Sequence, residues 1–141
     1  MITVISATNR SHSNTEKIAR FYVQLMEKQG VVPKLFSLEQ LSPDMEFIDL
    51  YGKHSLKFQQ LLDEYIIPAE KFVFIVPEYN GSFPGILKLF IDAVHPDLNR
   101  GKKSALVGVS AGRAGNLRGL DHLTGVLHYL GIHVHPNKIP V

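Results

Sequence analysis

The sequence predicts an α/β fold, a doubly wound parallel sheet with helices packed on it, in a single domain over residues 1–141. Apolar segments of strand length alternate with segments of helical periodicity. The central apolar segment, Phe72–Val76, has no polar alternation, which is typical of a strand buried on both faces. The loops after the first, central and fourth strands are long and polar, whereas the connections into strands are short. Because parallel strands end at one edge of the sheet, we expect those loops to form a ligand site there.

The first half of the chain opens with a β-branched strand, Ile2–Ile5, and a helix that ends near Gly30. Ser13 and Glu16 have the spacing of a capping box, and Gly30 stands where a glycine closes a helix. The helix has these apolar positions at helical spacing: Ile18, Tyr22, Leu25 and Met26.

The second strand is predicted at Val31–Phe36, with Pro33 indicating an edge position. No period holds through residues 37–53, where Ser42-Pro43-Asp44 predicts a turn. A helix is expected at Ser55–Ile67. Its apolar positions are Leu56, Leu61, Leu62 and Tyr65.

The second half continues the alternation after the central strand. A helix is expected at Pro84–Val94, because proline is tolerated where a helix begins. A buried strand, Ser104–Val109, and a weak last strand, Ile132–Pro140, flank a further helix that ends at Gly131. That helix has apolar residues at helical spacing, namely Leu120, Leu123, Leu127 and Leu130. Five strands favour the order 2-1-3-4-5 over the other common doubly wound order, which sets the first and central strands side by side.

Composition narrows the function classes. The chain is 45% apolar and 20% charged, as in a globular protein. A formal net charge of +2 gives no reason to expect nucleic-acid or membrane binding. No cysteine is present, which excludes disulfides and thiolate chemistry. No apolar run approaches the roughly 18 residues of a membrane helix, so we expect a cytoplasmic protein without membrane or nucleic-acid partners.

The first loop combines small polar side chains with one arginine, Arg10, just before a helix. Its hydroxyl and amide residues are Ser6, Thr8, Asn9, Ser11, Ser13, Asn14 and Thr15. Backbone N–H groups and the helix dipole favour an anion at this place. The glycines and lysine of a P-loop are absent, so side-chain hydroxyls are the expected ligands. A well-capped helix behind a polar turn explains the same composition. Glu16 counts against an anion site unless its carboxylate folds back onto its cap.

The central and fourth-strand loops add different chemistry. Tyr79 can offer a flat face to a ring, and Asn80-Gly81 allows positive φ and exposes backbone N–H groups. In the later loop, Ser110–Asn116, glycines permit close backbone approach, and Arg113 or Arg118 can meet a phosphate. A plain turn with a packed tyrosine, and a surface loop with a solvated arginine, remain the structural alternatives.

No catalytic residue and no metal site are predicted. Glu78 has neither a histidine nor a second carboxylate beside it in the sequence. His133 and His135 share one face of a strand, but two histidines alone are weak evidence for a metal. His122 and His128 lack the four-residue spacing of a helical metal pair.

With these residues in hand, the chain resembles the NADPH-dependent FMN reductases of the flavodoxin-like superfamily, which include chromate-, azo- and quinone-reducing relatives. Residues 77–88, PEYNGSFPGILK, are close to the family signature PEYNxSxPGxLK. Residues 6–15, SATNRSHSNT, are similar to its SGSxRxxSxN loop, with Ala7 in place of glycine. Residues 110–116, SAGRAGN, look like its third loop, with Asn116 in place of a frequent second glycine.

The resemblance implies a flavodoxin-like fold, FMN as cofactor and NADPH or NADH as hydride donor. It implies that the FMN phosphate is held by Thr8, Arg10, Ser13, Asn14 and Thr15. It implies that the isoalloxazine is lined by Pro77, Glu78, Tyr79, Asn80 and Gly81, and that the other side is closed by Ser110, Gly112 and Arg113. It further implies a homodimer or homotetramer and a small-molecule acceptor such as free flavin, a quinone, an azo compound or a metal ion.

One departure from the family is that no final helix follows the last strand within this sequence, which ends at Val141. We therefore expect one face of the sheet to be partly uncovered, or covered by another subunit. The expected activity is hydride transfer from NAD(P)H to flavin and on to an acceptor. A non-catalytic flavin-binding electron carrier and a regulatory α/β module without redox chemistry are the alternatives.

Overall fold

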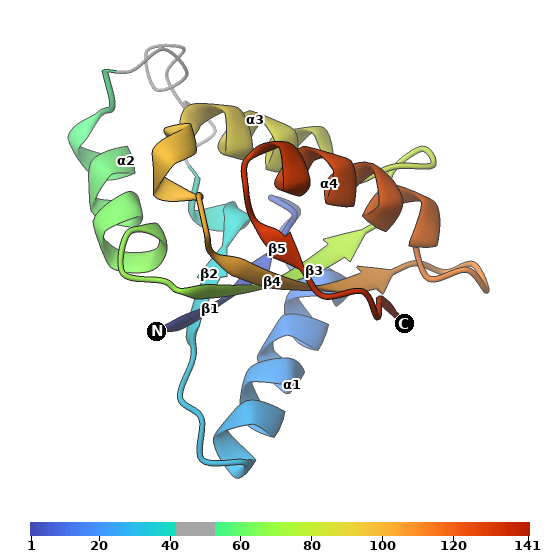
Figure 1. The fold of residues 1–141 in the computed structure, drawn as a ribbon. Coiled ribbons are helices and arrows are strands. Elements are labelled where there is room, and N and C mark those ends of the chain that lie inside the picture. The colour runs from blue at the N-terminus through green and yellow to red at the C-terminus, as the bar shows by residue number, and fades with distance from the viewer. Residues whose placement is uncertain (42–52) are drawn as a thin grey trace.

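The computed structural model describes residues 1–41 and 53–141 of the chain, and the turn expected at Ser42-Pro43-Asp44 lies outside them. Strands and helices alternate along the chain (Figure 1). The strands are β1 Ile2–Ser6, β2 Lys34–Ser37, β3 Lys71–Pro77, β4 Lys103–Val109, β5 His133–Val134 and β6 Ile139–Pro140. The α-helices are α1 Asn14–Lys28, α2 Leu56–Leu61, α3 Gly85–Ala93 and α4 Leu117–Tyr129. A π-turn, Leu62–Ile66, continues α2, and short 3-10 turns lie at Leu38–Gln40 and Pro96–Leu98.

The strands form one parallel sheet in the order β2-β1-β3-β4-β5, which confirms the predicted order. The expected last strand is divided, because β5 and β6 pair separately with β4. Between them, the Asn137 N–H, which is next in register after those of His133 and His135, donates to His135 Nδ1 at 3.2 Å, so the pairing with β4 is interrupted there. The sheet therefore has six strands in place of the five expected.

The second strand begins later than predicted, at Lys34 rather than Val31. Gly30 has φ +76°, and the Val31 N–H donates to the carbonyl of Met26, which closes α1 and holds this segment out of the sheet. Val32 is 81% exposed. The predicted edge position is confirmed, because β2 pairs only with β1 among the described strands.

The helix expected at Ser55–Ile67 forms, and three of its four predicted apolar positions, Leu61, Leu62 and Tyr65, pack on the core. Leu56, expected to face the core, is 86% exposed. Phe58 and Ile66, which were not predicted, are buried in line with Leu62, four residues apart along α2 and its π-turn. The π-turn widens the last turn of the helix. The side chains in this turn therefore point in other directions than a regular 3.6-residue period predicts.

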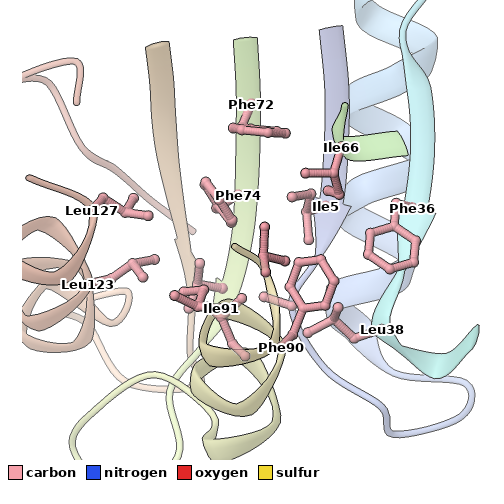
Figure 2. Close-up of a cluster of buried hydrophobic side chains, with 14 of the residues drawn as sticks. Ile5, Phe36, Leu38, Ile66, Phe72, Phe74, Phe90, Ile91, Leu123 and Leu127 are labelled. Atoms are coloured by element: carbon pink, nitrogen blue, oxygen red, sulfur yellow. The ribbon is translucent and has the colours of Figure 1, made fainter. Parts of the chain in front are cut away.

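The core lies on both sides of the sheet. Figure 1 shows α1 on one side and α2, α3 and α4 on the other. Alternation along β3 sends Phe72, Phe74 and Val76 to the three-helix side, and Val73 and Ile75 to the α1 side. Figure 2 shows Phe74 of β3 among side chains from the helices and neighbouring strands on the larger side. The strand is thus buried on both faces, as its unbroken apolar run predicts.

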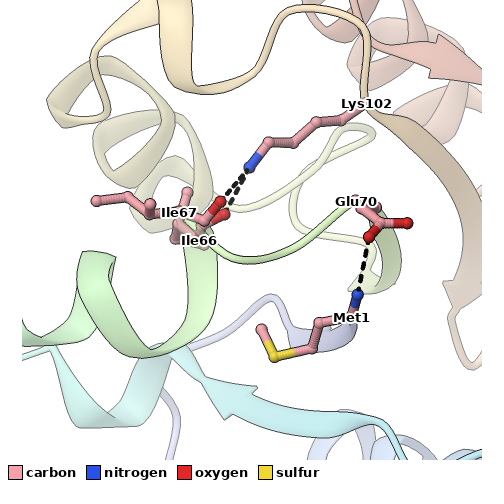
Figure 3. Close-up of polar contacts among 5 residues, drawn as sticks. All are labelled: Met1, Ile66, Ile67, Glu70 and Lys102. Carbon is pink, nitrogen blue, oxygen red and sulfur yellow. Dashed lines mark hydrogen bonds and ion pairs between the residues drawn. The ribbon is translucent and has the colours of Figure 1, made fainter.

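The amino end of the sheet is tied by two polar contacts (Figure 3). The Lys102 ammonium donates to the carbonyls of Ile66 (2.5 Å) and Ile67 (3.4 Å) at the end of the π-turn. The α-amino group of Met1 lies 3.5 Å from Glu70 Oε1. Burial lowers the pKa of Lys102 from its ordinary value. These contacts fix the start of β1, β3 and β4 at the edge opposite the polar loops.

Candidate functional site

A crevice of about 1050 Å³ opens at the carboxyl ends of β1, β3 and β4, where the sequence predicts a site. All three predicted loops contribute to its walls. It is lined by Asn9, Arg10, Ser11, Ser13, Asn14, Thr15, Lys17, Ile18, Pro77, Glu78, Tyr79, Val109, Ser110, Ala111 and Val141.

A side-chain bond joins the first and central loops, 71 residues apart. The buried Thr8 Oγ1 and the Tyr79 hydroxyl are 2.7 Å apart, and the Arg10 backbone N–H also donates to Thr8 Oγ1. The Arg10 guanidinium lies over the Tyr79 ring, 5.2 Å from its centroid. The Thr8 hydroxyl therefore fixes the orientation of the Tyr79 side chain. Arg10 and Tyr79 together form one rim of the crevice.

The first turn of α1 presents polar groups to the crevice. Ser13 caps the helix by accepting from the Glu16 N–H at 3.1 Å, which is half of the predicted capping box. The Glu16 carboxylate pairs with Arg20 at 2.8 Å, so the other half of the box is replaced by an ion pair. Glu16 is absent from the crevice wall, whereas Asn14 and Thr15 line it. The Glu16 carboxylate does not fold back onto its cap, but its ion pair with Arg20 keeps it away from the crevice wall.

The central loop is a tight two-residue hairpin. Tyr79 and Ser82 exchange both backbone hydrogen bonds, at 2.9 and 3.1 Å. Asn80 and Gly81 between them have φ of 51° and 79°, as a type I′ turn requires. The predicted positive φ is thus confirmed. The turn projects past the end of β3 and holds the Tyr79 ring at the crevice.

The third loop is held by its own hydroxyl and by the end of the chain. Ser110 Oγ bridges to the N–H and the carbonyl of Gly112, each at 3.0 Å. The Ser110 N–H donates to the Val141 carbonyl at 3.1 Å. A β-carbon on Gly115 would lie 2.4 Å from the β-carbon of Pro140, so β6 packs directly on this loop.

Asn116 connects the third loop to the end of the central strand. It is fully buried and left-handed, with φ 61°, and its Nδ2 donates to the Val76 carbonyl at 3.0 Å. Asparagine is one of the few residues that tolerate this conformation, which explains how it stands where the family often has glycine. A β-carbon on Gly119 would lie 2.1 Å from Asn116 Oδ1, so the helix needs glycine there.

The structure brings most of the predicted binding residues to the crevice and leaves others outside its wall. Those on the wall are Arg10, Ser13, Asn14, Thr15, Pro77, Glu78, Tyr79 and Ser110. Those behind or beside it are Thr8, Asn80, Gly81, Gly112 and Arg113. Thr8 acts through Tyr79, and Arg113 is exposed on the third loop.

Sequence reasoning assigned no role to several wall residues. Lys17 lies one helical turn from Asn14 and donates to its side chain at 3.4 Å, a spacing that could have identified it. Val109 and Ala111 flank Ser110 and could have been found from the end of the strand. Val141 carries no local signal, because it reaches the crevice only through the pairing of β6 with β4.

Comparison with known proteins decides the family. The model of the NADPH-dependent FMN reductase family matches residues 1–141. The chain belongs to this family. It is 38% identical over 117 residues to an NAD(P)H-dependent FMN reductase of Pseudomonas aeruginosa, covering 77% of this chain and 62% of that protein. It is also 38% identical over 73 residues to a 2-hydroxy-1,4-benzoquinone reductase of a Burkholderia species, covering 49% of this chain and 40% of that protein.

Solved structures support the fold. An NAD(P)H:acceptor flavoenzyme of Paracoccus denitrificans superimposes with a TM-score of 0.80 at 24% identity, covering 97% of this chain and 76% of its own. A flavodoxin of Pseudomonas aeruginosa gives 0.60 at 15% identity, covering 99% and 82%. The flavodoxin-like fold of this family member is therefore confirmed. The chain spans less than two thirds of the length of both curated relatives.

The described residues contain neither a membrane-spanning helix nor a metal-binding cluster. Across residues 1–41 and 53–141, no helix is long and apolar enough to cross a membrane. In the same ranges, no group of three or more histidine, aspartate or glutamate side chains is arranged to hold a metal ion.

Proposed function

We propose that this family member binds FMN in the crevice and works as an NAD(P)H-dependent FMN reductase. Bound FMN would supply the redox chemistry, accepting a hydride from NAD(P)H and passing electrons to a second acceptor. The observation that carries the proposal is the convergence of the three motif loops on one crevice. Residues 1–141 would belong to a single flavin-binding domain.

The donor set at the α1 end fits a phosphate. Hydroxyls of Ser11, Ser13 and Thr15 line the wall there, at the positive end of a 15-residue helix. Arg10 and Lys17 add two cations on the same wall. The Glu16 carboxylate is held by Arg20 and is absent from the wall, so the charge at this end is positive. An anion is stabilised by each of these features.

The other end of the crevice fits a flat ring. Pro77, Tyr79 and Val109 offer apolar surface from two neighbouring strands. The volume is at the upper end of the range for small-molecule sites, about 300–1000 Å³. Tyr79 is held by Thr8, so its ring needs little reordering when a ligand enters. The protein's own contribution is to orient the ring and to exclude water from it.

We propose that the exposed arginines Arg113 and Arg118 meet phosphates of the pyridine nucleotide. Arg113 lies on the third loop and Arg118 in α4 directly after it, and neither has an acidic partner within residues 1–41 and 53–141. The Arg118 guanidinium lies beside Gly81 of the central hairpin, the turn that carries Tyr79. A quinone is the favoured class of acceptor, because the Burkholderia relative is named for a benzoquinone.

The decisive experiment is an absorbance spectrum of the purified protein, stripped of flavin and then titrated with FMN. We expect stoichiometric binding, bleaching of the flavin band on anaerobic addition of NADPH, and recovery of the band when a benzoquinone is added. Binding without bleaching would indicate an electron carrier. A protein that takes up no FMN would refute the proposal and favour a regulatory module.

A matched pair of variants locates the phosphate end. Ser13 and Ser55 each cap a helix with one side-chain oxygen, at 3.1 and 3.2 Å from the N–H three residues on. Ser13→Ala and Ser55→Ala should each lower the free energy of unfolding by about 1 kcal/mol. Only Ser13→Ala should also weaken FMN binding, by about tenfold for one charge-assisted hydrogen bond. Equal FMN affinity in the two variants would contradict the placement of the FMN phosphate at the start of α1.

Assembly and location remain predictions. We propose that the protein forms a homodimer or homotetramer and works in the cytoplasm. Sedimentation velocity of the FMN-loaded protein tests the first, and fractionation of cells that express the natural gene tests the second. A monomer at all concentrations would contradict the predicted assembly.

A further inference from the structure

The hairpin of residues 79–82, which we call the Tyr79 hairpin, is held on two sides. On the crevice side, the Tyr79 hydroxyl lies 2.7 Å from Thr8 Oγ1, and the Arg10 guanidinium lies over the Tyr79 ring. On the other side, the first turns of α4 pack against the hairpin. This second side contains a histidine, His122, which is absent from the crevice wall.

One flank of α4 faces the Tyr79 hairpin. Residues three and four apart share a flank of a helix, so Arg118 and Gly119 lie on the same flank as His122. The Arg118 guanidinium lies 3.7 Å from the place of a β-carbon on Gly81. A β-carbon on Gly119 would lie 2.8 Å from the carbonyl carbon of Ser82, so the backbones of helix and hairpin are in contact here. A short side chain on the hairpin can therefore reach this flank.

His122 makes the side-chain hydrogen bond across this contact. Its Nδ1 lies 2.9 Å from Ser82 Oγ, 40 residues away in the sequence. A hydroxyl both donates and accepts, so Ser82 can pair with either tautomer of the imidazole. Ser82 in turn exchanges both backbone hydrogen bonds with Tyr79, at 2.9 and 3.1 Å. His122 thus holds the backbone of Tyr79 through Ser82, whereas Thr8 holds the far end of the same side chain.

We propose that His122 is a positioning residue of the flavin site, which keeps the Tyr79 hairpin in the place that the bound ring requires. Its side chain lines a hollow of about 590 Å³ between α3 and α4 and not the crevice, so it acts through Ser82 without touching the flavin. The effect on FMN rests on the proposed function. The effect on the hairpin is a property of the chain alone.

A solvated surface histidine with an incidental contact is the alternative, because solvent reaches this hydrogen bond. Under that alternative, loss of the imidazole would change neither the hairpin nor the flavin site. Under the proposal, the loss removes one ordinary hydrogen bond, which corresponds to an effect of about two- to tenfold.

Hydrogen exchange of the flavin-free protein tests the first step. The N–H groups of Tyr79 and Ser82 are bonded to each other's carbonyls, so their exchange rates report opening of the hairpin. His122→Leu should speed this exchange by about two- to tenfold. His122→Asn should restore the rate to within about twofold, because its amide places a donor or an acceptor where Nδ1 lies. Leucine is a better helix former than histidine, so a loss of helix propensity would not explain faster exchange in the leucine variant.

FMN titration tests the second step by a double-mutant cycle. His122→Leu and Ser82→Ala should each weaken FMN binding by about two- to tenfold. The double variant should bind FMN no more weakly than the weaker single variant, because the same hydrogen bond is lost in all three. His128→Leu is the control, since it replaces another exposed histidine of α4, and it should keep the wild-type exchange rates and FMN affinity.

Three outcomes would overturn the inference. They are unchanged hairpin exchange in His122→Leu, additive losses of FMN affinity in the double variant, and an equal effect of His128→Leu. Faster exchange with wild-type FMN affinity would overturn the link to the flavin site. A wild-type chain that takes up no FMN would instead refute the proposed reductase, while the exchange rates still decide whether His122 orders the hairpin. Circular dichroism checks the fold, and should His122→Leu unfold, Ser82→Ala carries both measurements.

Discussion

The buried Asn116 offers the sharpest test of how the site is attached to the sheet. Its Nδ2 donates to the Val76 carbonyl at 3.0 Å, just before the central loop begins, and its φ of 61° starts α4. Two variants separate these roles. Asn116→Gly removes the hydrogen bond and keeps the left-handed conformation without strain, whereas Asn116→Ala removes the bond and adds a β-carbon that disfavours the conformation.

The magnitudes follow from burial. Both Asn116 and Val76 are fully buried, and losing the hydrogen bond between them costs about 0.5–1.5 kcal/mol in either variant. The left-handed backbone adds about 1–2 kcal/mol for alanine. Asn116 Oδ1 has no hydrogen-bond partner, and its removal offsets part of the loss in both variants. We therefore expect Asn116→Ala to be less stable than Asn116→Gly by about 1–2 kcal/mol, a large share of a typical 5–15 kcal/mol.

Urea unfolding followed by circular dichroism measures both free energies, with equal slopes required for the comparison. FMN titration of the same variants measures the effect on the binding site. The lost hydrogen bond loosens the end of β3, next to the hairpin that carries Tyr79. Asn116→Gly should keep the fold and bind FMN more weakly than the wild-type chain. Equal stability of the glycine and alanine variants would refute the backbone argument. Wild-type FMN affinity in the glycine variant would refute the link to the site.

Three further predictions concern stability. Gly115→Ala should lower the free energy of unfolding by at least about 1–2 kcal/mol, because φ at Gly115 is +49° and the added β-carbon would collide with β6. Gly125→Ala is the control. No atom lies within 4 Å of its added β-carbon, so it should raise the free energy of unfolding by about 0.5–1 kcal/mol in the same urea assay. Lys102→Met should lower the unfolding free energy by about 1 kcal/mol, since two helix-end carbonyls lose their donor. Hydrogen bonding and charge from Lys138 hold the pKa of the Asp121 carboxyl below its ordinary value. The stabilisation by the Asp121–Lys138 pair is therefore present above the ordinary pKa and is lost as pH falls through the lowered pKa. Asp121→Asn should flatten the fall in urea midpoint as pH drops from about 5 to about 2.

Most of the fold could be predicted because its signals are local. The apolar run Phe72–Val76 fixes a central buried strand, and Gly30 and Gly131 close their helices at positive φ as expected. The errors arose where tertiary contacts outweigh a local pattern. Leu56 fits a helical period and yet is exposed, because Phe58 fills the core position. The start of the second strand was misplaced because the closing turn of α1 holds Val31.

The candidate site was predictable to the extent that its residues sit in their loops. Ser13, Tyr79 and Ser110 reach one crevice because each follows a parallel strand. The tie between Thr8 and Tyr79 spans 71 residues and has no local signature. Val141 enters the crevice for the same kind of reason, through strand pairing far along the chain. Such pairings depend on the register of the sheet, which a single sequence does not encode in any one segment.

The contacts at the two ends of the sheet have different roles. At the carboxyl end, long-range side-chain and backbone bonds from Thr8, Asn116 and Ser110 tie three loops to each other and to the strands. At the amino end, Lys102 and Met1 fix the strand starts, and Lys71 and Lys103 are exposed. A charge change at these two lysines leaves every hydrogen bond of the crevice intact. Lys71→Glu/Lys103→Glu should therefore leave FMN affinity unchanged, whereas Asn116→Gly should weaken FMN binding.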